Sequence, residues 1–311
     1  MTNMTCLCRT ATTFIKDGGI DEEAQREFLQ RFVDNKLGVY LASAGSGESH
    51  AMSKAEIKRV YEIGVAVGKG KIQVNANPPE QHTAKATREH TMLAIEAGIE
   101  VVNVYGPASW HGFKPTSDEY FAYYDDTLRG INHPIAIAPN PTIGYLPTPS
   151  QIAEVSNRHR QVVAINLSGC DTSYFLELKG EMKRNEVEIY VPFPDSFNTL
   201  KLGATGLVSM EGNILPKTFR RYIDAYEQGR YDEMAKLYGD IARFIRHVRK
   251  WQSSTPRWLK MAMAVLEVPG GKGGLREPYR MPNDAEVKKF TDGLYKLGLE
   301  EIEEIRTNLA H

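Results

Sequence analysis

The sequence of 311 residues is poor in cysteine and carries no excess of charge of either sign. Its three cysteines, Cys6, Cys8 and Cys170, are too few and too unevenly placed for a disulfide framework, and a lone Cys-x-Cys pair is weak evidence for a metal site. Lys and Arg number 38 against 39 for Asp and Glu. This balance gives no electrostatic basis for binding nucleic acid or an anionic membrane surface, so a small, locally recognised ligand is favoured.

Long apolar runs are also missing. Residues 1–19 contain no apolar core of signal-peptide length, and nowhere do about 18 apolar residues follow one another. From these absences we expect a cytoplasmic protein with no membrane anchor, whose cysteines are reduced.

Short apolar, β-branched runs alternate with helical stretches along most of the chain. In the stretch 54–68, Ile57, Val60 and Val65 fall on one helical face, and Gly64 leaves room for close packing there. Strands that are each followed by a helix imply a parallel sheet, and eight such units predict a closed (β/α)8 TIM barrel. The eight predicted strands lie within residues 5–14, 37–42, 72–75, 100–105, 134–138, 162–167, 187–191 and 206–209.

Strand patterns stop near Pro216, and the remaining sequence is helical in pattern over 219–250, 256–266 and 284–308. We expect residues 1–220 to form the barrel core and residues 221–311 to pack on it as a C-terminal helical extension, together one compact unit. A doubly wound sheet is the main alternative, but the first strand-to-helix turn has no Gly-x-Gly-x-x-Gly sequence.

Several motifs resemble those of the dihydrodipicolinate synthase and N-acetylneuraminate lyase family. The segment from Thr12 to Asp21 is similar to the family's V-T-P-F-x-x-D-G-x-[IV]-D opening, and residues 44–49, AGSGES, resemble its G-[TS]-T-G-E-S loop. Further along, 202–216 is similar to L-G-A-x-G-[VI]-I-S-x-x-x-N-x-x-P, and 276–278 matches R-x-P. The resemblance covers most of the chain and implies a TIM barrel that assembles as a homotetramer or homodimer.

In the family, the glycine-rich loop holds the carboxylate of pyruvate. The resemblance therefore implies that Ser46 and Gly47 bind a small carboxylate. The residue types agree with this role, because small side chains let the backbone approach a ligand and N–H groups in such a turn face an anion. A glycine-rich turn with no ligand is the alternative.

At the family's catalytic positions, this sequence departs from the family's pattern. Asn166 stands where the family has the lysine that forms an imine with the 2-oxo acid, and an amide cannot form that imine. Ala138 stands at the family's first tyrosine, and Tyr105 is close to its second. The family's arginine at the site entrance has no counterpart among residues 142–144. The concerted change of these groups, with the loop retained, indicates a repurposed pocket.

Other polar residues near the predicted strand ends are candidates to replace the missing groups. His111, Tyr105 and Asn166 are the candidate catalytic residues. Beside Ser46 and Gly47, the candidate substrate-binding residues are Ser168, Asn140 and Glu211. His111 on an exposed or interface loop with no catalytic role is the competing interpretation.

Two other chemistries could replace the imine. A divalent metal held by His111, Glu48, Glu211 and Asp195 has suitable ligand types but no spacing motif, and we expect no metal or other cofactor. The second alternative is that a lysine from another element, such as Lys114 or Lys201, reaches the site and forms the imine.

The leading hypothesis is a lyase of this family that acts on a 2-oxo acid or related small carboxylate, by aldol cleavage, hydration or dehydration, without a lysine imine. In this hypothesis Ser46 and Gly47 hold the carboxylate, and Asn166 and Ser168 form hydrogen bonds with the substrate oxygen. His111 or Tyr105 transfers the proton. The alternative is a catalytically silent paralogue that binds a small carboxylate as a sensor or inactive subunit. Genuine dihydrodipicolinate synthase activity would need the imine that Asn166 cannot form.

Overall fold

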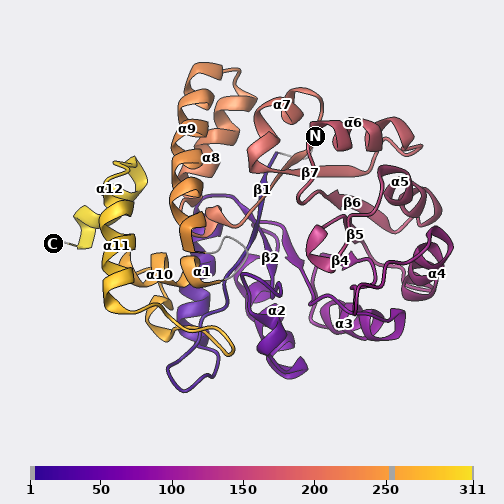
Figure 1. Cartoon of the computed structure of the whole chain (residues 1–311), viewed down its shortest axis with the longest axis horizontal. Helices are drawn as coiled ribbons and strands as arrows, with labels where there is room; N and C mark the ends of the chain where they lie inside the picture. Colours follow the sequence, from indigo (N-terminus) through magenta and orange to yellow (C-terminus); the bar gives the residue numbers. More distant parts are fainter. Residues whose placement is uncertain (1–3, 252–255, 310–311) are drawn as a thin grey trace.

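A closed barrel of eight parallel strands forms the centre of the protein, seen in a computed structural model that describes residues 4–251 and 256–309 (Figure 1). Neighbouring strands pair in chain order, and β1 closes the barrel by pairing with β8. The TIM barrel and the eight strands predicted from the sequence are thereby confirmed. The strands are β1 Cys6–Arg9, β2 Gly38–Leu41, β3 Val74–Ala76, β4 Val101–Tyr105, β5 Ile135–Ala138, β6 Val162–Asn166, β7 Glu188–Pro192 and β8 Gly206–Ser209.

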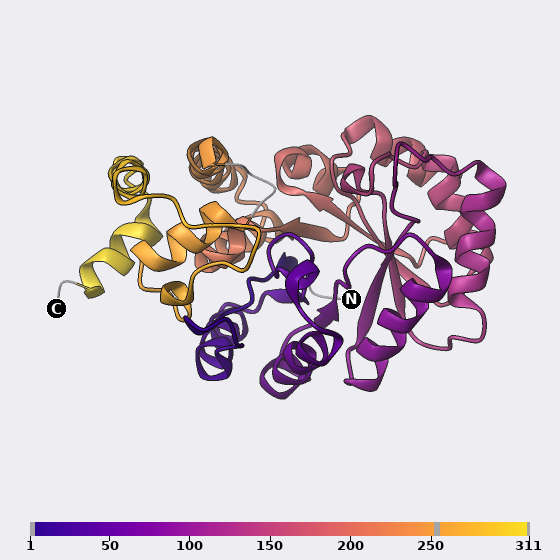
Figure 2. The same ribbon diagram turned by 60° about the horizontal axis from the view of Figure 1, so that its bottom comes forward.

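A ring of helices surrounds the barrel, one after each strand, and further helices follow at the C-terminus (Figure 2). The ring is made of α1 Glu22–Asp34, α2 Lys54–Gly68, α3 Ala84–Glu96, α4 Ser117–Leu128, α5 Pro149–Arg158, α6 Thr172–Glu181, α7 Ser196–Lys201 and α8 Pro216–Glu227. The C-terminal helices are α9 Tyr231–Val248, α10 Arg257–Val265, α11 Asp284–Tyr295 and α12 Glu300–Leu309.

Local sequence explains where these helices begin and how closely they pack. Ser53 caps α2 in a reciprocal capping box with Glu56, and Asp21 caps α1 through its carboxylate. On α2, a Cβ at Gly64 would lie 2.2 Å from Cδ1 of Leu41, so only glycine lets this helix approach β2 so closely. The predicted role of Gly64 is confirmed.

Alternate residues of each strand point into the barrel, because side chains along a strand alternate between its two faces. The apolar part of the interior is a small buried cluster of Leu7, Tyr40, Ala136, Ala164, Tyr190 and Val208. Toward the N-terminal ends of the strands, the Tyr190 hydroxyl donates to Glu188 at 2.8 Å. Toward the C-terminal ends, the inward positions are occupied by asparagine, tyrosine and arginine, and there the candidate site lies.

The C-terminal helices differ from the prediction in their breaks. The stretch 219–250 is two helices, because the chain turns at Gly229 with φ +68°, and 284–308 is divided in the same way at Gly298 with φ +59°. Helix α8 therefore completes the barrel ring, and the extension starts with α9, which packs on α8. The predicted division at residue 220 falls within α8 and stays a prediction.

The extension lies along one side of the barrel, next to α1 and α8 in both views (Figures 1 and 2). None of the helices in the described part of the chain is long and apolar enough to cross a membrane.

Candidate active site

Asn166 is the last residue of β6 and lies at the centre of a polar cluster inside the barrel. Its Nδ2 donates to the Tyr40 hydroxyl at 2.7 Å and to Oδ1 of Asn103 at 2.8 Å. All three side chains are buried, with 1% of each residue exposed. Branched aliphatic side chains usually fill this part of a TIM barrel, so a buried amide and phenol cluster is a departure that suits binding rather than packing.

The cluster continues from Asn103 to the end of the fourth strand. Nδ2 of Asn103 donates to Oδ1 of Asn77 at 3.0 Å, and the Tyr105 hydroxyl donates to the same oxygen at 3.1 Å. Burial raises the pKa of Tyr105, although the charge of Arg9 and hydrogen bonds with Asn77 and Asn140 act in the opposite direction. The phenol therefore stays protonated at neutral pH, and its O–H acts as a hydrogen-bond donor.

The direction of these bonds leaves defined groups free for a ligand. Asn166 uses Nδ2 for both contacts, while its Oδ1 is buried without a hydrogen-bond partner, as is Oδ1 of Asn75. The Tyr40 hydroxyl accepts from Asn166, which leaves its own hydrogen available. Because an unpaired buried polar atom costs about 1–3 kcal/mol, these atoms indicate a place where a polar ligand binds.

Arg9, the last residue of β1, brings a positive charge to the mouth of the barrel. Its Nη1 donates to Oγ of Ser168, two residues beyond Asn166, at 3.0 Å. Its Nε is buried without a hydrogen-bond partner. The structure thus places the predicted Ser168 next to a cation that the sequence analysis did not identify.

The glycine-rich loop after β2 is compact, because the backbone N–H groups of Gly47 and Ser49 donate to the hydroxyl and the carbonyl of Ser43, each at 3.2 Å. A Cβ at Gly47 would lie 2.7 Å from the backbone nitrogen of Ser43, so glycine is required there. The carbonyl of Gly47 accepts from the Thr12 hydroxyl at 2.7 Å. The hydroxyls of Ser46 and Ser49 are buried without a hydrogen-bond partner, which makes both available to a ligand.

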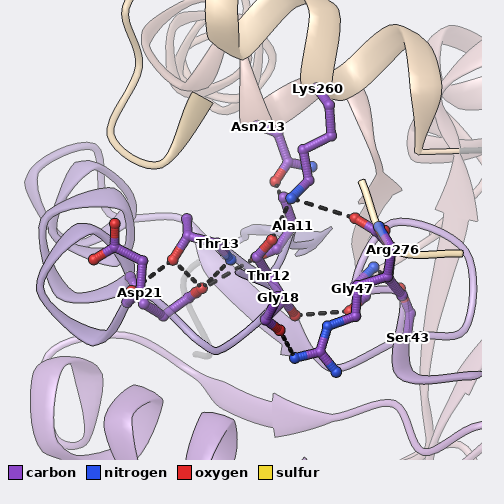
Figure 3. A network of polar contacts seen from close by, with 12 residues as sticks. Ala11, Thr12, Thr13, Gly18, Asp21, Ser43, Gly47, Asn213, Lys260 and Arg276 are labelled. Carbon is purple, nitrogen blue, oxygen red and sulfur yellow. Dashed lines mark hydrogen bonds and ion pairs between the residues drawn. The ribbon is translucent and has the colours of Figure 1, made fainter. Parts of the chain in front are cut away.

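A buried ion pair supports this loop from the C-terminal extension (Figure 3). Lys260 of α10 reaches the loop after β1, where its Nζ donates to the Thr12 carbonyl at 2.5 Å and lies 3.3 Å from Oε1 of Glu48. The other Glu48 oxygen accepts from the backbone N–H of Arg276 at 2.8 Å. Burial lowers the pKa of Lys260, and the Glu48 carboxylate opposes this change. Glu48 therefore links the glycine-rich loop to the C-terminal extension.

The remaining candidates lie in different surroundings. Asn140 is buried beside Tyr105, and its Oδ1 accepts from the backbone N–H of Thr142 at 3.1 Å. Glu211 accepts from the Ser209 hydroxyl at 2.9 Å and from the Met210 N–H at 3.2 Å, within its own turn. His111 is exposed on the loop between β4 and α4, with φ +50°. The structure thus brings Tyr105, Asn140, Asn166 and Ser168 together, whereas His111 and Glu211 make no contact with this cluster among the described residues.

No group of three or more His, Cys, Asp or Glu side chains in residues 4–251 and 256–309 is arranged to hold a metal ion. The alternative lysines are exposed: Lys114 lies on the same loop as His111, and Lys201 packs its ammonium over the rings of Phe197 and Tyr231. A hollow of about 470 Å³ lined by Thr5, Gly38 and Gln73 lies at the N-terminal ends of the strands, the face opposite to the one where TIM-barrel sites occur.

Four residues of this region were not identified from the sequence, namely Arg9, Tyr40, Asn103 and Lys260. The first three carry one detectable signal, because each is a polar residue at an inward position of an otherwise apolar strand. Asn103 and Tyr105, for example, alternate with Val102 and Val104 along β4. Lys260 lies within an apolar helix, RWLKMAMAV, and only the packing of that helix on the first loop reveals its surroundings.

The closed barrel defines the class of the protein as a (β/α)8 barrel, and the polar cluster at the C-terminal ends of its strands is a candidate small-molecule site at the usual face. The sequence profile of the dihydrodipicolinate synthetase family matches residues 4–296, and the chain belongs to this family.

Relatives agree with this assignment over nearly the whole chain. The 4-hydroxy-tetrahydrodipicolinate synthase of Methanococcus aeolicus is 24% identical over 292 residues, which cover 92% of this chain and 96% of the relative. Among solved structures, YagE of E. coli K12, a member of the dihydrodipicolinic acid synthase family in complex with pyruvate, superposes with a TM-score of 0.86 at 17% identity, covering 96% of this chain and 100% of YagE. Dihydrodipicolinate synthase of Thermotoga maritima gives a TM-score of 0.86 at 18% identity, covering 96% and 99%.

Proposed function

We propose that the protein is a lyase of the dihydrodipicolinate synthase family that acts on a 2-oxo acid, or a related small carboxylate, without forming a lysine imine. The observation that carries this proposal is the position of Asn166, whose amide occupies the inward end of β6 and is held by Tyr40 and Asn103. The one fully buried lysine among the described residues, Lys260, is engaged by Thr12 and Glu48.

The chemistry must then be carried by hydrogen-bond donors. Aldol cleavage or dehydration of a hydroxylated 2-oxo acid moves an electron pair toward the ketone oxygen, and without an imine the resulting enolate needs preorganised donors. The hydroxyls of Tyr40 and Ser168 are available for this role. The unpartnered Oδ1 of Asn166 can accept from a substrate hydroxyl.

Proton transfer falls to Tyr105 in this proposal. In aldol cleavage the phenol acts as a relay, taking the proton of the substrate hydroxyl as its own proton passes to the enolate carbon. Its ring packs against Ala138 and Ile143 at the mouth of the barrel. Since Ala138 is small, Tyr105 from the neighbouring strand has room beside it. The buried hydroxyls of Ser46 and Ser49, which have no hydrogen-bond partner, then hold the substrate carboxylate. The family resemblance favours a homotetramer or homodimer, which sedimentation velocity would establish.

Borohydride trapping with pyruvate, followed by intact mass spectrometry and peptide mapping, tests the proposal directly. We expect no covalent adduct, together with pyruvate binding that calorimetry detects. A stable adduct on any lysine, Lys260 included, would overturn the proposal and restore imine chemistry.

Turnover separates the lyase from a silent carboxylate binder. A panel of hydroxylated 2-oxo acids is incubated with the protein, and release of pyruvate and loss of the hydroxyl group are followed by NMR. Conversion of at least one acid supports the lyase. Binding without conversion of any acid would assign the protein as a sensor or inactive subunit instead.

A further inference from the structure

Arg9 is a cation at the mouth of the barrel with no anionic partner. It is half-buried, its Nη1 donates to the neutral Ser168 hydroxyl at 3.0 Å, and its Nε is buried without a hydrogen-bond partner. Within residues 4–251 and 256–309, no carboxylate forms an ion pair with it. Partial removal of an unpaired charge from water is costly, so this arrangement fits a site whose counter-charge arrives with the ligand.

Glu80, in the loop after β3, interacts electrostatically with Arg9. Burial raises the pKa of the Glu80 carboxyl, while the charges of Arg9 and His50 act in the opposite direction. Because Glu80 is largely removed from water and is not ion-paired with Arg9, it does not saturate the donors of the guanidinium. Several of the five N–H groups of Arg9 remain available to an anion.

The height of Arg9 in the barrel indicates which part of a ligand it meets. Arg9 is paired with Tyr40 in the sheet, and its guanidinium contacts Ser168, two residues beyond Asn166 in the direction of the mouth. A ligand with its carbonyl beside Asn166 and Tyr40 and its carboxylate on the Ser46 loop extends its remaining atoms past this guanidinium on the way to solvent.

We infer that Arg9 binds a second anionic group at the far end of the substrate, so that the site takes dicarboxylic 2-oxo acids in preference to monocarboxylic ones. This inference rests on the proposed function, because it assumes that the first carboxylate lies on the Ser46 loop. A guanidinium suits the role, since its planar fork can bond both oxygens of a carboxylate at once.

The test compares two acids of equal chain length, 2-oxoglutarate and 2-oxopentanoate, which differ only in the terminal carboxylate. Calorimetry on the wild-type protein is expected to give binding of the diacid that is about 10- to 100-fold tighter, the range for one charge-assisted contact. Arg9→Met is expected to abolish this preference, and Arg9→Lys to keep part of it because the charge remains without the fork.

Two further variants control the comparison. Ser46→Ala is expected to weaken both acids equally, because both share the 2-oxo carboxylate. Arg158→Met, at an exposed helix position, is expected to change neither affinity.

Three outcomes would overturn the inference or its basis, and they are distinguishable. Equal affinity of the wild type for the two acids would overturn the inference alone, and so would an Arg9→Met variant that weakens both acids to the same extent. Binding of neither acid by the wild type would overturn the proposed function. The wild-type comparison stands even if an Arg9 variant does not fold.

Discussion

Lys260 and Glu48 form a fully buried ion pair between the C-terminal extension and the loop that follows β2, with Nζ and Oε1 3.3 Å apart. Neither side chain has any exposed surface. The carboxyl group is further held by the backbone of Arg276, whose guanidinium stacks over Phe14 and bonds Glu56 at 2.5 Å. Through these contacts, Lys260 and Arg276 hold the predicted carboxylate loop against the C-terminal part of the chain.

Replacement of Lys260 by Met should destabilise the protein by about 3–5 kcal/mol, because it leaves the Glu48 charge buried without its cation. Urea unfolding followed by circular dichroism measures the change. The double variant with Glu48→Gln should recover part of the loss. Lys54→Met, which breaks an exposed pair with Glu89, serves as the control and should cost less than about 1 kcal/mol. Equal effects of the two single variants would contradict a stabilising role for the buried pair.

Glu56 should make the stability of the protein sensitive to acid. The hydrogen bond from Arg276 lowers its pKa to about 2 from the ordinary value of 4.5, so the unfolded chain binds the proton more tightly than the folded protein. The stabilisation is therefore complete above the ordinary pKa and is lost as the pH falls through the folded pKa.

The Glu56→Gln variant tests this dependence, because Gln can still accept in the capping box but does not titrate. Its deficit in free energy of unfolding should be largest at about pH 7 and should shrink toward about pH 2. Urea titrations at several pH values measure the difference. Glu89→Gln, at an exposed pair, should show a much smaller effect, and a constant deficit for Glu56→Gln would contradict the assigned cause.

Asn166→Lys should create a lysine that borohydride traps with pyruvate at residue 166. Burial among Tyr40 and Asn103 should lower the pKa of the new amine and so favour its nucleophilic form. Intact mass and peptide mapping locate the adduct, and Asn166→Gln, which has no amine, should give none. A folded Lys variant that binds pyruvate without forming an adduct would show that residue 166 is not placed as the family's lysine is.

Tyr105→Phe should lower kcat by about 100-fold or more while changing KM little, because it removes the proposed proton donor but keeps the ring. His111→Ala should leave both constants within a few fold, since His111 lies on an exposed loop. Steady-state kinetics with the best substrate of the panel measures both. The opposite pattern, with a slow His111 variant and an active Tyr105 variant, would assign proton transfer to the loop after β4.

The barrel could be predicted from the sequence because alternating apolar strands and amphipathic helices leave few other ways to bury both faces of a sheet. Details that depend on single residues were harder to predict. The break at Gly229 turned one expected helix into two, since a glycine in a helical pattern is compatible with either a continued helix or a helix end.

The site was predictable only in part. Asn166 lies at the end of a predicted strand, and Ser168 and Ser46 come shortly after predicted strands, so their positions at the barrel mouth follow from the fold. The partners of Asn166 come from β2 and β4, and no local pattern in the sequence indicates that Tyr40 and Asn103 meet it inside the barrel. Likewise, the pairing of Glu48 with Lys260 depends on how α10 packs, which neither helix propensity nor spacing determines.

The side-chain amides of Asn77 and Asn166 take opposite roles in the hydrogen bonds inside the barrel. The two positions therefore differ in how they respond to an acidic substitution. Asn77 only accepts, from Asn103 and Tyr105, so an aspartate there would keep both hydrogen bonds. Asn166 only donates, and an aspartate in its place would direct a carboxylate oxygen at Oδ1 of Asn103. An aspartate should therefore disrupt these hydrogen bonds at position 166, whereas at position 77 its cost is that of burying a charge.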